Sequence, residues 1–260
     1  MRLCEKERIN NKRLYIEMPS IHIQSFETAL EAAEDSATKV SRYLREAGDT
    51  HVLFLMAGGS SFDIFQKIIW PHNTQMITLG VLDERYSRDV TVNNCAQLMG
   101  FAKYAEFCDR GGSIIDTRIE ETETLEQSAR KFEDSLRQWR TNFPLGKIII
   151  VQGMGADGHT AGMMPYPENK QLFADLFEHE DVWVRGYDAG IKNHAPLRFT
   201  TTVPFLVHEV DASFMTIVGE EKSRVFHGAL EDQKYETALA ATPITVIKKM
   251  KSVFVAECNS

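Results

Sequence analysis

The sequence lacks several features that would place it in a specialised class of protein. Its 260 residues include only four cysteines, which lie far apart with no CxxC pair: Cys4, Cys95, Cys108 and Cys258. This spacing fits neither a zinc knuckle nor a dense disulfide framework, so we expect reduced and mostly buried thiols. The chain also has no HExxH segment and no clustered cysteine and histidine, and we therefore expect no bound metal.

Long apolar runs and an excess of basic residues are missing as well. No run approaches the roughly 18 residues of a membrane span, and the opening MRLCEKER is charged where a signal peptide is apolar. The 29 basic and 37 acidic residues give a formal net charge of −8, which repels nucleic acid and anionic lipid. We therefore expect a cytoplasmic protein with neither nucleic acid nor membrane as a partner.

The rest of the composition is typical of a globular domain. Hydrophobic residues make up 43% of the chain and charged residues 25%, which are ordinary values, and the length allows a sizeable core. No internal repeat, low-complexity segment or linker marks a boundary, so we expect one domain over residues 1–260. Residues 165–196 are the least regular part, and we expect a lid or small excursion there.

Two apolar patterns alternate along the chain. Short continuous apolar runs, which suit strands buried on both faces of a sheet, occur at residues 51–57, 76–82, 147–152, 181–185, 212–218 and 252–256. Helical spacing or helical composition is found over residues 25–46, 122–139 and 221–230. This alternation predicts an α/β fold: a doubly wound, mostly parallel, Rossmann-like sheet with helices on both faces.

Two loops after predicted strands have the residues of a phosphate site. Ligands of open parallel sheets bind beyond the carboxyl ends of the strands. The loop Gly58-Gly59-Ser60-Ser61 leads into a helix, and its glycines and helix start suit a phosphate, although an ordinary turn capped by Ser61 has the same sequence. Arg85, in Asp83-Glu84-Arg85-Tyr86, could hold a phosphate while a neighbouring carboxylate orients it or contacts sugar hydroxyls. A solvated salt-bridge cluster is the alternative.

A third loop, GMGADGHT at residues 153–160, also follows a predicted strand. It contains GxGxxG, but a dinucleotide fingerprint needs a long helix next, and Pro165 and Pro167 follow at once. Its distinctive residues are Asp157 and His159, because an imidazole beside a carboxylate is the arrangement of a general base. The alternative is a structural His159 that caps the turn.

Five segments in order along nearly the whole chain resemble one known family. GMGADGHTA at residues 153–161, with Pro165 after it, resembles the signature of 6-phosphogluconolactonases, which share a superfamily with glucosamine-6-phosphate deaminases. The other segments that resemble family motifs are Gly58-Gly59-Ser60, Asp83-Glu84-Arg85 followed by Asn94, PLRFTT at 196–201 and GEEK at 219–222. This chain departs from the family pattern at Ser61-Phe62, Asn93 and Met163-Met164.

The resemblance implies hydrolysis of 6-phospho-D-glucono-1,5-lactone to 6-phosphogluconate, in the oxidative pentose phosphate pathway, without a cofactor. It assigns His159 as the base that activates water and Asp157 as the residue that orients it or contacts substrate hydroxyls. The cationic candidates for the phosphate are Arg85, Arg198 and Lys222. The other implied substrate-binding residues are Gly58, Gly59, Ser60 and Asp83.

Two other functions remain open on the sequence. A deaminase of the sister family has a glutamate five residues after the motif histidine, where this chain has Met164. A non-catalytic sugar-phosphate sensor that regulates transcription would need a helix-turn-helix, which residues 1–50 do not provide. The expected partner is a small sugar phosphate, and the chain is expected to be a monomer or a small homo-oligomer.

Overall fold

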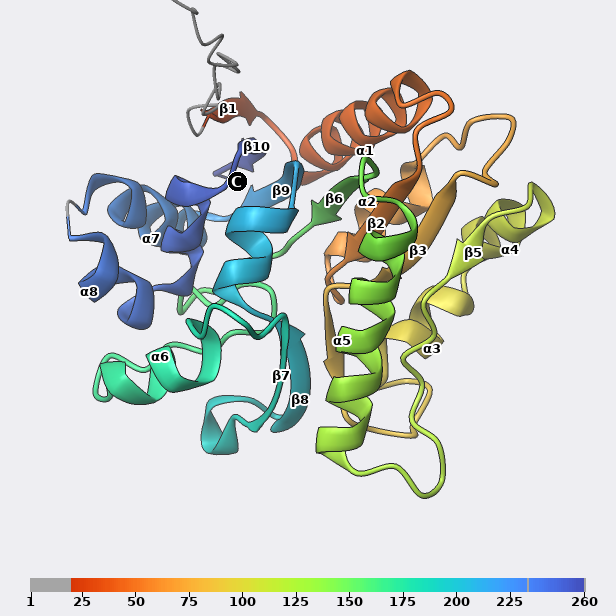
Figure 1. Ribbon diagram of the computed structural model, residues 1–260. Helices are drawn as coiled ribbons and strands as arrows, with labels where there is room; N and C mark the ends of the chain where they lie inside the picture. The colour runs from red at the N-terminus through yellow and green to blue at the C-terminus, as the bar shows by residue number, and fades with distance from the viewer. Residues whose placement is uncertain (1–19, 233, 260) are drawn as a thin grey trace, which may run out of the picture.

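The computed structural model describes residues 20–232 and 234–259 (Figure 1). The charged first residues and Cys4 lie outside the described part. Seven strands form one parallel sheet in the order β1-β10-β9-β6-β2-β3-β5. These strands are β1 (Ser20–Phe26), β2 (Val52–Met56), β3 (Ile77–Val81), β5 (Ser113–Ile114), β6 (Lys147–Val151), β9 (Ala212–Val218) and β10 (Ser252–Cys258).

Helices cover both faces of this sheet, which confirms the predicted α/β architecture. The α-helices are α1 (Ala29–Glu46), α2 (Ser61–Lys67), α3 (Asn94–Met99), α4 (Ala102–Asp109), α5 (Leu125–Asn142), α6 (Lys170–Phe177), α7 (Glu220–Glu231) and α8 (Tyr235–Ala241). Three further helical segments are η1 (Gly190–Lys192), η2 (Phe205–Glu209) and η3 (Pro243–Lys249). Within the described residues, no helix combines the length and the apolar character that crossing a bilayer requires.

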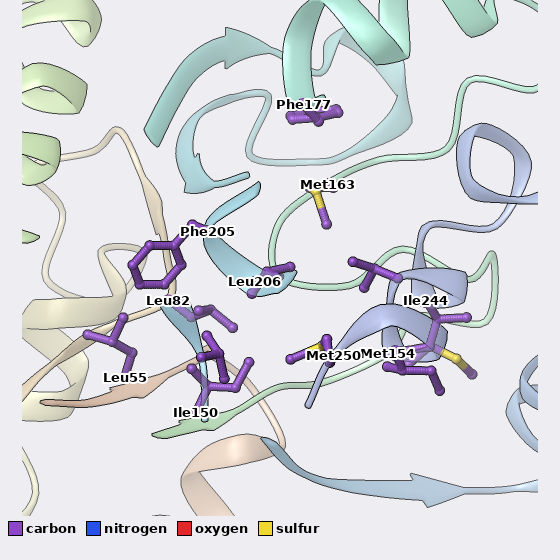
Figure 2. Packing of buried hydrophobic residues seen from close by; sticks show 14 of the residues in the cluster. Leu55, Leu82, Ile150, Met154, Met163, Phe177, Phe205, Leu206, Ile244 and Met250 are labelled. Carbon is purple, nitrogen blue, oxygen red and sulfur yellow. The ribbon is translucent and has the colours of Figure 1, made fainter. Parts of the chain in front are cut away.

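The central strands are apolar throughout because each of their faces is buried against helices. In β2, Leu53 and Leu55 belong to the core that includes α5, α7 and α8, whereas Phe54 belongs to the core of α1 to α4. Figure 2 shows Leu55 and Ile150 of the sheet in the first core, with Phe205 and Leu206 of η2. Since successive side chains of a strand point to opposite faces, two cores require an unbroken apolar run.

The predicted helix over residues 25–46 is wrong at its start. Residues Ser20–Phe26 form strand β1, and α1 begins at Ala29. Thr28 sets this boundary through a capping box, in which its hydroxyl accepts from the amide of Glu31 at 3.2 Å and its own amide donates to the Glu31 carboxylate at 3.0 Å. Phe26 matches the helical spacing by chance.

A second, antiparallel sheet was not predicted. It consists of β4 (Asp83–Arg85), β8 (Leu197–Thr201) and β7 (Val184–Asp188), in the order β4-β8-β7. The apolar run at 181–185 was predicted as one more strand of the alternation. It overlaps only the start of β7, and β7 belongs to the small sheet and not to the large one. Figure 1 shows β7 and β8 beside α6, away from the large sheet.

Residues 165–196, expected to be the least regular part of the chain and to form a lid or small excursion, have regular secondary structure. This segment contains α6, β7 and η1, and Phe173 and Phe177 of α6 are fully buried in the core. A helix that continued from the glycine-rich loop would be broken by Pro165 and Pro167, but these prolines do not prevent the later residues from forming regular structure.

Candidate active site

The site lies where the direction of chain progression changes within the large sheet. From β2 the chain continues to β3 and β5 on one side, whereas β6, β9 and β10 follow on the other side. β2 and β6 are therefore neighbours whose following loops diverge, and ligands of open α/β sheets bind in the crevice at such a point. The loops after these two strands are Gly58-Gly59-Ser60 and the GxGxxG-containing segment 153–160.

Buried side chains fix the loop after β6 from below. Gln152, 1% exposed, donates to the Ser213 hydroxyl at 2.8 Å and accepts from the Thr160 hydroxyl at 3.2 Å. Thr160 pairs with Met154 and Met163 in isolated bridges, and both methionines belong to the core in Figure 2. The loop is thus closed on itself and anchored in the core at both ends.

The small sheet holds the same loop from the side. Ala161 has a φ of 48°, which is unusual for a residue with a side chain. Its carbonyl accepts a hydrogen bond from the Thr200 hydroxyl of β8, and the next carbonyl, of Gly162, accepts from the Tyr187 hydroxyl of β7 at 2.5 Å. Strained backbone of this kind persists only where neighbours hold it, and it occurs mainly at functional sites.

Within this loop, His159 and Asp157 form a close pair. The imidazole Nδ1 lies 2.6 Å from Asp157 Oδ1, and the same oxygen accepts from the His159 amide at 3.1 Å. A Cβ atom on Gly155 would come within 2.2 Å of the imidazole, so only glycine allows the ring to occupy this position. Nδ1 is therefore directed to the carboxylate, and Nε2 makes no hydrogen bond to any of the residues that the structure describes.

The electrostatics of the pair suit a base held by an anion. Partial burial opposes ionisation of Asp157, but hydrogen bonds and charge from His159 outweigh it, and the pKa of this carboxyl falls below its usual range. The carboxylate therefore stays ionised at neutral pH and favours the tautomer of His159 with a proton on Nδ1. A histidine oriented in this way can accept a proton at Nε2.

The small sheet brings two arginines together in the same site. Arg85 of β4 and Arg198 of β8 are direct cross-strand partners. Like charges in this position destabilise a sheet, so their pairing indicates a demand for positive charge. Asp83 neutralises part of this positive charge. Its Oδ2 accepts a hydrogen bond from Arg198 Nη2 at 2.9 Å, and both side chains are only about 5% exposed.

Several donors of these arginines remain without a partner. Nε of Arg85 and both Nε and Nη1 of Arg198 are buried and make no hydrogen bond within the described residues. Buried guanidinium donors are rarely left unpaired, and they recognise phosphate or carboxylate well. Lys222, half-buried near the start of α7, adds a third cation to the same cleft.

These groups line one cleft of about 240 Å³. Its lining residues are Ala57, Gly58, Gly59, Ser60, Asp83, Arg85, Asn94, Gly153, Met154, Gly155, His159, Ala161, Gly162, Arg198 and Lys222. The cleft therefore includes every residue predicted from the sequence except Asp157, which contacts it through His159. Larger hollows of about 670 and 480 Å³ lie along α5 and beside residues 87–93, but they do not contain this combination of groups.

Two polar residues were not among the predicted site residues: Asn94, which lines the cleft, and Glu84, which lies behind it. Asn94 is 1% exposed, and its Oδ1 has no hydrogen-bond partner within the described residues. A Cβ atom on Gly58 would lie 2.2 Å from this oxygen, so Gly58 makes room for Asn94. Glu84 is fully buried behind the cleft. The sequence offered one signal for these two residues, namely their positions: Glu84 lies within the Asp83-Glu84-Arg85 motif, and Asn94 follows it.

The geometry after Gly158 differs from that of a dinucleotide site. The chain forms the bridges of Thr160 instead of a helix, and the next helix, α6, begins only at Lys170.

Met164, at the position of the deaminase glutamate, is fully buried in the core and does not line the cleft. No cluster of three or more histidine, cysteine, aspartate or glutamate residues suited to a metal occurs within the described residues.

Comparison with known proteins gives a family and several similar structures. Residues 24–255 match the family described as glucosamine-6-phosphate isomerases/6-phosphogluconolactonase. The chain belongs to this family. A 118-residue segment is 31% identical to a Caenorhabditis elegans protein named "Putative 6-phosphogluconolactonase", and the match covers 44% of this chain. It spans only 41% of that protein.

Solved structures of the family share the fold. A 6-phosphogluconolactonase from Shewanella baltica matches with a TM-score of 0.68 and 21% identity, over 93% of this chain and 99% of its own. A monomeric glucosamine-6-phosphate deaminase matches with a TM-score of 0.62 and 18% identity, over 91% of this chain and 96% of its own. Since both enzymes have this fold, the choice between their activities depends on the residues of the cleft.

Proposed function

We propose that this protein hydrolyses 6-phospho-D-glucono-1,5-lactone to 6-phosphogluconate. The observation that carries the proposal is the composition of a single cleft. One wall presents the His159–Asp157 pair, and the other presents the partnerless donors of Arg85 and Arg198. A lactone that bears a distant phosphate needs a base for water at one end and cations at the other. The family match over residues 24–255 supports a single domain of this kind.

In the proposed reaction, His159 Nε2 removes a proton from a water molecule as the water oxygen attacks the lactone carbonyl carbon. Asp157 accepts the Nδ1 proton in a hydrogen bond and stabilises the imidazolium that forms. The tetrahedral intermediate collapses, the bond between the carbonyl carbon and the ring oxygen breaks, and His159 returns its proton to that oxygen. One water is consumed, and the imidazole regains its starting state.

The cationic wall would anchor the phosphate. Arg85, Arg198 and Lys222 supply charge, while Gly58, Gly59 and Ser60 line the same cleft. Binding energy from a phosphate remote from the reacting carbonyl can be used to position that carbonyl against water. An unphosphorylated gluconolactone would therefore be a poor substrate. The carboxylate of Asp83 holds Arg198 in place and is available to contact sugar hydroxyls.

The same residues argue against a deaminase activity. Ring opening of glucosamine 6-phosphate needs a second acid–base group beside the motif histidine. The corresponding residue here is Met164, whose thioether cannot relay a proton and lies in the core outside the cleft. Asp83 does not distinguish the two activities, because both families resemble this chain at that position.

A coupled assay with freshly generated lactone tests the proposal, with the spontaneous hydrolysis rate subtracted. Wild-type protein should accelerate hydrolysis, and it should release no ammonia from glucosamine 6-phosphate. The variant His159→Ala should lose this acceleration. His208→Ala is its matched control for the loss of a histidine, because His208 is largely exposed and lies outside the cleft. Ammonia release at enzymatic rates without lactone hydrolysis would overturn the proposal in favour of the deaminase.

A further inference from the structure

Glu84 is a buried carboxyl group for which the proposed reaction has no use. It lies on β4 between Asp83 and Arg85, and its side chain is fully buried. Successive residues of a strand face opposite sides. Asp83 and Arg85 line the cleft, and Glu84 instead contacts α3 and the segment after β5.

The carboxylate of Glu84 accepts hydrogen bonds from three backbone amides and one hydroxyl. Oε1 accepts from the amides of Arg85 at 2.8 Å and Asn94 at 2.6 Å. Oε2 accepts from the amide of Cys95 at 2.9 Å and the hydroxyl of Thr117 at 2.9 Å. Each oxygen therefore serves two donors, and only the ionised form can accept from all of them.

Two of these amides belong to residues that line the cleft. Arg85 and Asn94 each present a buried polar side-chain atom with no hydrogen-bond partner within the described residues, Nε and Oδ1 respectively. Asn94 is oriented further by its Nδ2, which donates to the Asp83 carbonyl at 2.9 Å. Glu84 Oε1 thus joins the backbones of both residues at one point behind the cleft.

We propose that Glu84 is a positioning residue, whose carboxylate fixes Arg85 and Asn94 in the geometry that binds the sugar phosphate. This inference rests on the proposed function for the identity of the ligand. Glu84 does not touch the substrate. It acts by keeping the start of α3 against β4, so that an anion-binding arginine and an amide oxygen stay aligned in the cleft.

The ionisation state of Glu84 then affects binding near neutral pH. Burial raises its pKa to about 7 in spite of the hydrogen bonds it accepts. Burial raises the pKa of the neighbouring Cys95 thiol to about 11, and Asp116 beside it is kept ionised because Arg118 lowers its pKa. On β4, Asp83 is paired with Arg198. Glu84 is therefore the carboxyl group of this cluster whose raised pKa falls between pH 6 and 8.

Glu84→Gln tests the inference. A glutamine side chain has one acceptor oxygen, so its NH₂ group must face at least one backbone amide that the carboxylate had satisfied. At pH 8 we expect the Kd for 6-phosphogluconate, measured by calorimetry, to rise about 10-fold. As the pH is lowered from 8 to 6, binding to the wild type should weaken more steeply than binding to the variant. Titration of the ligand phosphate is common to both proteins and cancels in this comparison.

Leu44→Ala separates positioning from general loss of stability. Leu44 is 3% exposed near the end of α1 and packs in the core of α1 to α4, outside the cleft. Its truncation should lower the melting temperature and leave the Kd and its pH profile unchanged. An equal rise of Kd in Leu44→Ala and Glu84→Gln, or no rise in Glu84→Gln, would overturn the inference.

Thr117→Val covers the case in which Glu84→Gln does not fold. It removes one donor to Glu84 with little change in side-chain volume, and we expect a rise in Kd of about 3-fold. Hydrogen exchange of the Asn94 and Cys95 amides gives a readout without any ligand. Faster exchange in Thr117→Val than in Leu44→Ala supports the role of Glu84, and equal rates contradict it. If wild-type protein neither binds 6-phosphogluconate nor hydrolyses the lactone, the proposed function fails, and the exchange rates still decide whether Glu84 holds α3.

Discussion

The two sheets of this protein use burial for different purposes. The large sheet buries apolar strands between two helical layers, and its interior strand β2 is buried along its whole length without a charged residue. In the small sheet, Asp83, Glu84 and Arg198 are buried, each at 4% exposure or less. Burying charges costs free energy unless they are paired. The large sheet therefore provides stability, whereas the small sheet places charges at the cleft.

A similar contrast separates the two walls of the cleft. His159 and Asp157 lie on a loop and are partly exposed, with side-chain exposures of 32% and 45%. Arg198 and Asp83 lie on strands and are almost completely buried. Changes on the loop wall should therefore affect the reaction with little loss of stability, and changes on the small sheet should affect both.

The largest expected effect comes from the loop wall. His159→Ala should lower kcat about 10²–10⁴-fold, because positioned proton transfer contributes about that much. The melting temperature should stay near the wild-type value, since the imidazole is partly exposed. Turnover and thermal melting of the same preparation check both points, with His208→Ala alongside. A folded His159→Ala protein with near wild-type kcat would remove this residue from the mechanism.

Arg198→Ala should combine a loss of binding with a loss of stability. It leaves the buried Asp83 carboxylate without its partner, which we expect to cost about 3 kcal/mol of unfolding free energy. Urea unfolding measures this loss. The double variant Asp83→Asn with Arg198→Met should recover stability but not affinity for 6-phosphogluconate. If binding returned together with stability, Arg198 would have only a structural role.

Lys222→Ala should affect binding alone. Lys222 lines the cleft, is only half-buried, and forms no ion pair among the residues that the structure describes. We expect affinity for 6-phosphogluconate to fall about 10-fold, with an unchanged melting temperature. The wild type should also prefer phosphorylated over unphosphorylated gluconolactone, and this preference should shrink in the variant. Equal wild-type activity on both lactones would contradict the phosphate anchor.

A dependence of stability on pH also originates in the small sheet. Burial raises the pKa of Glu84 from 4.5 to about 7, so the folded protein binds more protons than the unfolded chain between these values. The unfolding free energy that Glu84 contributes should therefore fall as the pH rises from 4.5 to 7, and then level off. Urea unfolding of wild type and Glu84→Gln across this range should show a falling difference. A constant difference would mean that Glu84 keeps an ordinary pKa.

Sequence patterns predicted the strands that are long enough to show a continuous apolar run. The runs at 51–57, 76–82, 147–152 and 212–218 each contain a strand of the large sheet, and the run at 252–256 covers the first part of β10, because burial on both faces requires continuous apolar residues. The strand β4 has three residues, too few for any periodicity, and the edge strand β5 has two. These elements could not be predicted because neighbouring strands, and not their own composition, stabilise them.

The candidate site divides in the same way. The His159–Asp157 pair was visible in the sequence because its members are two residues apart and the pairing needs only a tight turn. Their roles, and those of the cations, stay predictions. Asn94 and Glu84 were present in the motif segments, but their importance depends on hydrogen bonds across 10 to 33 residues of chain.

Local sequence patterns are sufficient to predict the parallel sheet, the loops at the carboxyl ends of its strands and the imidazole beside a carboxylate. The packing of distant segments, by contrast, places Arg85 opposite Arg198, pairs Asp83 with an arginine 115 residues away, and lets Glu84 join β4 to α3. The two groups of features differ in the range of the interactions that produce them. Side-chain periodicity and tight turns are encoded over a few neighbouring residues, whereas strand register and buried ion pairs depend on how distant segments pack.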